Sequence, residues 1–342
     1  MKAEFNGLNP RFQAITISIT ACIIVFLIFS LFYRFCSVDK RPPITQLTPA
    51  KLIQFGGASR KVQVGFSVNN FIEFDTIHNT FKIAGVVWFK FDPSLIELET
   101  LEKFTFLKGN IEEKSAPSTY LVGDHIIARY IVRVSFGTSL YYGYFPFEDH
   151  RIFLSLANFA VSPTEVIFES AEQDFIIAQE AFISGWQYQD KSVIAGYGTL
   201  SIGKNVKDIH FPQVIFEMDY YHYSTRYIIM IILPLLIIFF IELFSLCLDH
   251  RENQSTLIQL STTNITGLLA YRFVIETIVP KVGYATLADY FFFLFLGTST
   301  FMFFINVVGP YLTIWHKKLL SIGLQTLVIG VFIYLFEFWV KC

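Results

Sequence analysis

The sequence predicts a membrane protein with an external β-sandwich followed by a four-helix transmembrane bundle, and with an extra transmembrane segment at the N-terminus. The chain has 342 residues, of which 53% are hydrophobic and 18% aromatic, and its mean hydropathy is +0.50. A soluble protein of this length is less apolar. Apolar stretches of membrane-spanning length lie at the N-terminus and in the last third of the chain, whereas the middle alternates short β-prone runs with turn-prone clusters.

The first apolar stretch covers residues 13–33, and at about 20 residues it has the length of a full membrane span. A secretory signal peptide is the alternative, but its apolar core is typically about 7–15 residues long and ends at small residues. Residues 32–36 offer no such cleavage site. The interpretation is therefore a transmembrane signal anchor over residues 1–37, with a cleaved signal as the alternative.

The middle of the chain is predicted to be one β-domain over residues 62–223. Residues 38–61, which contain Pro42-Pro43 and Gly56-Gly57, are predicted to form a linker before it. Turn-prone clusters then separate β-rich runs at intervals typical of a sandwich. These runs are residues 62–68, 81–91, 125–136, 151–156, 192–202 and 211–221.

The last part of the chain, residues 224–342, is predicted to hold four helices. They cover residues 226–248, 254–279, 285–312 and 319–340. Most of the basic residues that flank them lie in two short links, residues 249–252 and 315–318. The positive-inside rule places both links in the cytoplasm and the β-domain outside it.

The second of these helices carries a polar stripe. Ser255, Gln259, Thr263 and Thr266 recur at three- and four-residue spacing, which places them on one face. Such a stripe has two common meanings in a membrane. It serves helix packing, because small and hydroxyl side chains let helices approach, or it lines a water-filled pore shared by several copies. The helix by itself does not decide between them.

Several classes of function are excluded by composition. The formal net charge of −2 leaves no basic surplus to neutralise the phosphates of a nucleic acid. A Gly-rich phosphate loop, a metal-ligand cluster and a nucleophile elbow are all missing from the sequence, so we expect no enzyme, no cofactor and no metal site. The four cysteines lie in or beside apolar stretches without metal-ligand spacing: Cys22, Cys36, Cys247 and Cys342.

Four segments match motifs that occur in this order in one family of membrane receptors. Residues 144–150, Tyr-Phe-Pro-Phe-Glu-Asp-His, are similar to a Phe-Pro-Phe-Asp-x-Gln loop at the base of that family's sandwich. Residues 91–95, Phe-Asp-Pro-Ser-Leu, are similar to the end of its Trp-x-Asp-Pro-Arg-Leu strand, with Lys90 in the place of Trp. Leu233-Pro234 resembles the proline of its first channel helix, and residues 275–284 resemble the end of its pore helix and the loop beyond.

The family is that of the pentameric ligand-gated ion channels, the Cys-loop receptor superfamily, and the resemblance covers residues 62–342. No cysteines flank Phe145-Pro146, as in bacterial-type subunits. The resemblance implies an Ig-like, ten-stranded sandwich that serves as a neurotransmitter-gated channel ligand-binding domain. It also implies a homopentamer in the lipid bilayer of the bacterial inner membrane, which an unknown small-molecule agonist or protons open to permeant ions.

The family's spacing, counted back from Pro280, also predicts which residues face the pore. Thr266 stands where the family usually has the Leu or Ile of a hydrophobic gate, so the dry constriction is expected at Phe273. Glu252 is the acid nearest to the cytoplasmic mouth, which favours cations over anions. The predicted pore-lining residues are Ser255, Gln259, Thr263, Thr266, Ala270, Phe273 and Thr277.

The resemblance further implies that the base of the sandwich pushes on the helices during gating. His222 occupies a position where many members have an Arg, and it could titrate against Asp75 or Glu148, because His changes charge within about pH 5 to 8; another base, Arg226 included, could instead take the place of that Arg. The predicted coupling residues are Asp75, Phe145, Pro146, Glu148, Asp149, His222, Arg226, Pro280 and Lys281.

Agonists of this family bind on aromatic residues between subunits, where rings attract amines by cation–π interaction. The residues at similar positions in this chain are Phe104, Phe106, Tyr130 and Tyr197. Trp186 is interpreted as a core residue of the sandwich. The alternative function is a membrane-anchored sensor or scaffold that has the channel fold and does not conduct.

Overall fold

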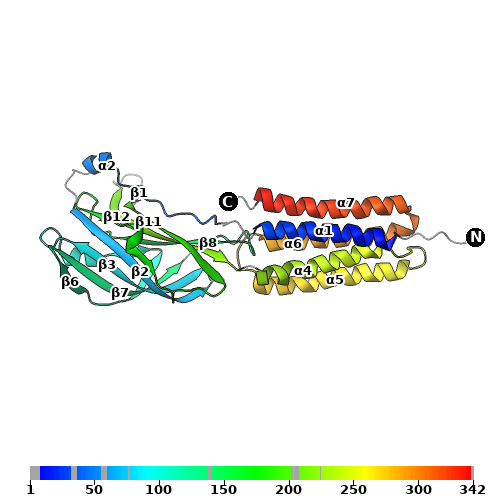
Figure 1. Ribbon diagram of the computed structural model, residues 1–342, viewed down its shortest axis with the longest axis horizontal. Coiled ribbons are helices and arrows are strands. Elements are labelled where there is room, and N and C mark those ends of the chain that lie inside the picture. Colours follow the sequence, from blue (N-terminus) through cyan, green and yellow to red (C-terminus); the bar gives the residue numbers. More distant parts are fainter. Residues whose placement is uncertain are drawn as a thin grey trace, which may run out of the picture. The chain divides into compact units, whose positions relative to one another are not determined.

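The chain forms two compact units in the computed structural model (Figure 1). The helical unit comprises Met1–Cys36, Tyr141–Glu148 and Tyr223–Cys342, and the β unit comprises Ser37–Leu140 and Asp149–His222. The structure describes residues 8–31, 37–54, 60–75, 78–137, 140–201, 203, 208–223 and 225–339.

The β unit contains two sheets that are arranged like a sandwich. The five-stranded sheet has the order β1-β11-β12-β8-β4, and the seven-stranded sheet has the order β10-β2-β3-β7-β5, with β6 paired to β7 and β9 paired to β2. Most pairs are antiparallel, whereas β9 and β10 run parallel to β2. The strands are β1 (Thr45–Gln46), β2 (Arg60–Asp75), β3 (Thr80–Phe91), β4 (Thr105–Leu107), β5 (Gly109–Lys114), β6 (Ser118–Val122), β7 (His125–Gly137), β8 (His150–Ala157), β9 (Val166–Glu169), β10 (Phe175–Ile177), β11 (Trp186–Leu200) and β12 (Ile209–His222).

Alternation of burial explains how the two sheets share one core. Every second residue of β3 is buried, as expected for a strand with one face on a core. The Phe66 ring of β2 lies 5.5 Å from the Phe106 ring of β4 and 5.7 Å from the Phe216 ring of β12, between ring centroids. Because β2 belongs to one sheet and β4 and β12 to the other, aromatic side chains fill the space between the sheets.

The prediction of a β-domain is confirmed, and its six predicted runs fall on β2, β3, β7, β8, β11 and β12. The sequence analysis missed the short strands β4, β5, β6, β9 and β10. It also assigned β1 and the short helix α2 (Pro49–Gln54) to a linker, although β1 pairs with β11. Another short helix is α3 (Leu98–Glu102). Strands of two to six residues give too few positions for a period to be visible.

Five long helices run side by side in the helical unit (Figure 1). Four of them are long and apolar enough to cross a membrane, namely α1, α4, α6 and α7, which confirms the prediction of a membrane protein. The helix with the polar stripe, α5, is not apolar enough to be counted with these four. The helices are α1 (Pro10–Leu31), α4 (Thr225–Ser245), α5 (Gln254–Ile278), α6 (Leu287–Val308) and α7 (Ile314–Ile333).

The last helix begins earlier than the sequence predicted, at Ile314 rather than at residue 319. Thr313 precedes it in an extended conformation and contacts the His316 ring, with 2.6 Å between Oγ1 and Nδ1. Residues 315–318, interpreted as a link, therefore form the first turn of α7, and Lys317 is buried. The chain reverses instead at residues 309–313, where a short turn, Gly309–Tyr311, ends α6.

Polar side chains join α1 to α7 and α4 inside the helical unit. The buried Gln13 donates from Nε2 to the carbonyl of Leu243, 3.0 Å away, and accepts at Oε1 from the Ser321 hydroxyl at 3.0 Å. The buried Gln325 donates to Ser321 Oγ at 3.0 Å and accepts from the Thr20 hydroxyl at 2.7 Å. Because unpaired polar groups are costly in an apolar surrounding, α1 and α7 each satisfy groups that the other buries.

We expect Gln325→Ala to destabilise the protein by about 1–2 kcal/mol, because it removes the buried hydrogen bonds of Gln325 with Thr20 and Ser321. Thermal unfolding of the purified, detergent-solubilised protein measures the effect. The matched control is Thr326→Ala, one residue along the same helix, where the hydroxyl is exposed and bonds only to the Ile322 carbonyl. Equal midpoints for Gln325→Ala and wild type would contradict this account of the α1–α7 contact.

Candidate functional site

The predicted pore-lining residues all lie on one exposed face of α5. Each residue turns an α-helix by about 100°, so these seven positions fall within an arc of roughly 80°. The four buried residues of the helix, Leu257, Ser261, Leu268 and Ile275, lie on the opposite side. The exposed positions are Ser255, Gln259, Thr263, Thr266, Ala270, Phe273 and Thr277.

The hydroxyl groups of this face present acceptors rather than donors. Thr263 donates its proton to the Gln259 carbonyl at 2.9 Å, and Thr266 donates to the Thr262 carbonyl at 2.9 Å. Nearer the end of α5, Thr277 donates to the Val274 carbonyl at 2.7 Å. A hydroxyl has one proton and two lone pairs, so the lone pairs of these oxygens remain for water or a cation.

Phe273 is the only aromatic residue among the seven, and its side chain is 72% exposed in the single chain. Ala270 lies one turn before it on the same face. If several copies of α5 turned this face inward, the Phe273 side chains would form an apolar ring between Thr266 and Thr277. Such a ring can close a channel by excluding water.

Polar side chains of α5 lie against its neighbours at three levels, and hydrogen bonds or ion pairs at two of them fix the rotation of the helix. In the loop before α5, His250 is buried and its Nε2 lies 3.1 Å from Asn306 Oδ1 of α6, while Asn306 Nδ2 donates to Ser261 Oγ at 2.8 Å. Burial, together with the nearby Lys317, lowers the pKa of His250. Further along, Asn264 lies beside the buried Glu242. All these contacts are on the side of α5 away from the exposed stripe.

The third level is an ion pair between Arg272 of α5 and Asp289 of α6. Arg272 also contacts Glu276 one turn later on α5, at 3.1 Å, and its guanidinium lies 5.4 Å from the centroid of the Phe292 ring. Asp289 in turn accepts from the backbone N–H of Thr286 at 2.7 Å. Neither Arg272 nor Asp289 was among the predicted site residues. A base and an acid in or beside apolar stretches were the available signal, because such groups usually pair inside a bundle.

We expect Arg272→Gln and Asp289→Asn each to lower stability, and the double variant to cost less than the sum of the two. Both variants remove the same charge-assisted hydrogen bond, worth about 1–3 kcal/mol, and the double variant leaves no unpaired charge. Thermal unfolding of all four proteins measures the coupling. The matched control is the cycle with the exposed Glu276→Gln, expected to couple to Arg272 by only about 0.3–0.5 kcal/mol. Additive effects for Arg272 and Asp289 would show that their contact contributes no free energy of coupling to the stability.

An acid and a base lie side by side just before the N-terminus of α5. Glu252, the predicted pore-mouth acid, is exposed, and the neighbouring Arg251 is exposed too. The backbone N–H of Arg251 donates to the buried Asp249 at 2.9 Å. The field of Glu252 at this end is therefore partly cancelled by a base next to it.

The Phe-Pro loop, Tyr141–Glu148, belongs to the helical unit although it follows β7 and precedes β8 in the chain. Phe145 is buried, its bond to Pro146 is cis, and its ring lies 5.6 Å from the Tyr227 ring of α4. The Phe147 ring lies 5.4 Å from the Phe336 ring beyond α7. The loop thus contacts both α4 and the residues that follow α7.

Backbone groups of the same loop cap the start of α6. The N–H of Leu287, the first residue of α6, donates to the Gly143 carbonyl at 2.9 Å. The next N–H, of Ala288, donates to the Phe145 carbonyl at 3.1 Å. The first N–H groups of a helix have no partner within it, so the loop supplies acceptors that α6 needs.

The link between α5 and α6 also contacts this loop. The Tyr142 N–H donates to the Tyr284 hydroxyl at 2.9 Å, and the Tyr284 ring stacks on the Tyr141 ring at 5.4 Å. Pro280, at the start of the link, is buried, whereas Lys281 is exposed. The structure therefore brings together two of the predicted coupling elements within one unit, Phe145-Pro146 and the link after α5, and it adds the start of α6 to them.

Two further coupling residues meet in the β unit. Asp149 Oδ1 accepts from the backbone N–H of His222 at 3.0 Å, and the His222 ring stacks on Trp186 at 4.2 Å. Asp75 holds a different histidine, because its carboxylate lies 2.6 Å from the ring of His78. Glu148 is buried in the helical unit, and Arg226 is exposed on the first turn of α4.

All four predicted ligand-binding rings are buried in the β unit. Phe106 packs in the core, while Phe104 and Tyr130 share one internal cation: Lys114 Nζ lies 4.5 Å from the Phe104 centroid and 5.1 Å from the Tyr130 centroid. Burial raises the pKa of Tyr130 to about 12 and lowers the pKa of Lys114. An external amine would have to displace Lys114 to reach these rings.

The fourth ring, Tyr197 of β11, is also in contact with a lysine of the same chain. Lys51 of α2 donates to the Tyr197 hydroxyl at 2.9 Å, and its Nζ lies 5.2 Å from the ring centroid. The segment before α2 covers the same place, because Thr45 of β1 pairs with Tyr197. The residues that were assigned to a linker therefore lie over the predicted ligand position.

Within the described ranges, no group of three or more His, Cys, Asp or Glu side chains could hold a metal ion. Cys22 and Cys247 are free thiols. Cys36 and Cys342 lie outside the described residues.

A scan against protein-family models finds no match to this chain, and a search of curated proteins finds no match either.

Proposed function

We propose that the chain is a subunit of a pentameric ligand-gated ion channel of the Cys-loop receptor superfamily, of the bacterial type, and that five copies place α5 around a central pore. The observation that supports this is the polar, exposed face of α5 opposite a buried apolar face, on the one long helix that is not among the four apolar ones. A polar helix face in a bilayer needs water or a partner, and a shared pore provides both.

Cations rather than anions are the proposed permeant ions. The threonine oxygens of the stripe have donated their protons to backbone carbonyls and so offer lone pairs to a passing cation. Glu252 adds an acid at the mouth, although Arg251 weakens its field. Phe273 is the proposed gate, because its exposed ring is the largest apolar group on the stripe.

In this proposal the β unit is an Ig-like ligand-binding domain outside the cytoplasm, with twelve strands in its described part rather than the expected ten, and the helical unit lies in the bacterial inner membrane. A small-molecule agonist or protons stabilise one arrangement of the sandwich in a two-state equilibrium. The Phe-Pro loop transmits the change, since its carbonyls cap α6 and its tyrosines contact the link after α5. Lys114 and Lys51, which lie on the predicted rings, make an agonist other than an amine the better fit.

Single-channel recording in planar bilayers tests the pore directly. We expect Phe273→Ala to raise leak current several-fold, because the apolar ring is lost, and Glu252→Gln to shift the reversal potential toward that of anions. Phe293→Ala is the matched control, since Phe293 is an exposed ring on α6 away from the stripe. If neither α5 variant differs from wild type in leak, threshold or reversal potential, the pore assignment is wrong.

The competing function is a non-conducting sensor or scaffold with the same fold. A purified pentamer that passes no ions in liposomes, with any ligand or pH tried, would favour it over a channel. A monomer in detergent would contradict both functions, because each requires assembly of several copies.

Proton gating has its own test, which depends on His222. We expect currents that change as the external pH is stepped between about 8 and 5, because a buried His222 would gain charge beside Trp186 and the coupling residue Asp149. His222→Gln should remove this dependence. The matched control is His125→Gln, which changes an exposed histidine of the same unit. An unchanged pH dependence in His222→Gln rules out this residue as the sensor.

A further inference from the structure

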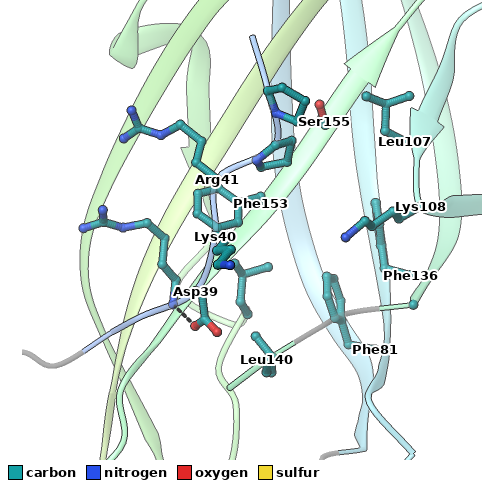
Figure 2. A pocket seen from close by; sticks show the side chains of 15 residues that line it. Asp39, Lys40, Arg41, Phe81, Leu107, Lys108, Phe136, Leu140, Phe153 and Ser155 are labelled. Atoms are coloured by element: carbon teal, nitrogen blue, oxygen red, sulfur yellow. Dashed lines mark hydrogen bonds between the residues drawn. The ribbon is translucent and has the colours of Figure 1, made fainter. Parts of the chain in front are cut away.

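The β unit has a cavity of about 400 Å³ beneath an extended segment, residues 39–43, which we call the strap (Figure 2). One wall comes from β3 and β7 of the seven-stranded sheet, and the other from β4 and β8 of the five-stranded sheet. Cavities of this size hold small organic molecules. A molecule bound here would contact both sheets and the strap at once.

The floor and walls of the cavity are mainly apolar. The rings of Phe81 and Phe136 stack with 4.9 Å between centroids, and each is 2% exposed, so they form a rigid floor. Leu107, Leu140 and Phe153 complete the walls. Such a lining favours an aromatic or branched apolar body over a fully polar ligand.

The strap is fastened to the sheet by polar contacts. Asp39 Oδ2 accepts from the backbone N–H of Arg151 at 3.0 Å and lies 3.0 Å from Nδ1 of His150. Arg41 makes a two-pronged contact with the buried Glu217, at 2.5 and 3.1 Å. The two prolines that follow have restricted backbones and no N–H group. The roof of the cavity is therefore preorganised.

The charges on the cavity are unequal. Its lining includes one acid, Asp39, and four bases, Lys40, Arg41, Lys108 and Arg151. Arg41 is paired with Glu217, and Arg151 holds Asp219 at 2.6 Å through both Nε and a terminal nitrogen.

Lys40 and Lys108 add further positive charge to the lining. Lys40 makes no hydrogen bond or ion pair within the described part of the chain. Figure 2 shows the Lys108 side chain reaching from the turn after β4 toward the strap that carries Lys40. Ammonium groups on both sides of an apolar cavity suit one negative group on the ligand.

We propose that this cavity binds a small organic anion, a carboxylate with an aromatic or branched apolar body. The carboxylate lies between Lys40 and Lys108, and the apolar body lies on Phe81, Phe136 and Phe153. The proposed site is separate from the rings at Phe104, Tyr130 and Tyr197. In a channel, an anion bound here would regulate gating, and this role rests on the proposed channel function. Binding of the anion does not depend on that function.

Calorimetric titration of the full chain in lipid nanodiscs tests the site with phenylpropionate as the probe. Its uncharged amide, phenylpropionamide, has the same body and corrects for partition into lipid. We expect the amide to bind at least about tenfold more weakly than the carboxylate, since it loses the charge-assisted contacts. Lys40→Gln and Lys108→Gln should each weaken phenylpropionate severalfold without changing the thermal unfolding midpoint.

Two controls make the outcome decisive. Lys103→Gln removes an exposed lysine of the same unit outside the cavity and should leave binding unchanged. Leu140→Trp fills the cavity and should abolish binding of both probes. Equal affinity for carboxylate and amide, unchanged affinity in both cavity-lysine variants, or no binding of phenylpropionate would overturn the proposal. A protein that binds the probe but never conducts would refute the channel function and leave the site intact.

Discussion

The rotation of α5 is the constraint on which the other features of the helical unit depend. Two polar contacts fix it: Ser261 with Asn306, and Arg272 with Asp289. Each is on the same side of the helix and is costly to break in an apolar surrounding. Since α5 cannot turn without losing them, its threonine stripe and Phe273 stay on the exposed side.

The contact between Arg272 and Asp289 also connects α5 to the Phe-Pro loop, through the start of α6. Asp289, the partner of Arg272, also accepts from the Thr286 N–H at the start of α6, and the next N–H groups donate to carbonyls of the Phe-Pro loop. A displacement of that loop would therefore disturb the capping of α6 first and the position of Arg272 next. All these contacts lie within the helical unit.

The β unit shows a second theme, in which the chain occupies its own predicted ligand positions. Lys114 lies on Phe104 and Tyr130, and Lys51 lies on Tyr197. The segment between α1 and β2 supplies both Lys51 and the strap over the cavity. This N-terminal segment thus covers Tyr197 and forms the roof of the cavity. The preformed, positively charged cavity is therefore a better candidate for a ligand site than the predicted rings.

The sequence by itself determined the class of the protein and most of its regular elements. β-prone runs between turn-prone clusters located the longer strands, and apolar length located the membrane helices, because both signals are local. The stripe on α5 was also readable, since helical spacing alone puts Ser255 and Thr266 on one face. The first turn of α7 was missed because residues 315–318 are rich in bases and have the composition of a polar link.

Only the tertiary structure decided which polar groups meet. The ladder from Gln13 to Gln325 joins residues more than three hundred positions apart, and the lysines on the aromatic rings come from strands and helices that no local period relates to them. The cavity under the strap likewise requires two sheets and a segment that the sequence marked only as a linker. Local patterns specify which face of an element is buried, whereas the partner of each buried polar group is set by the packing of distant elements, which no local pattern encodes.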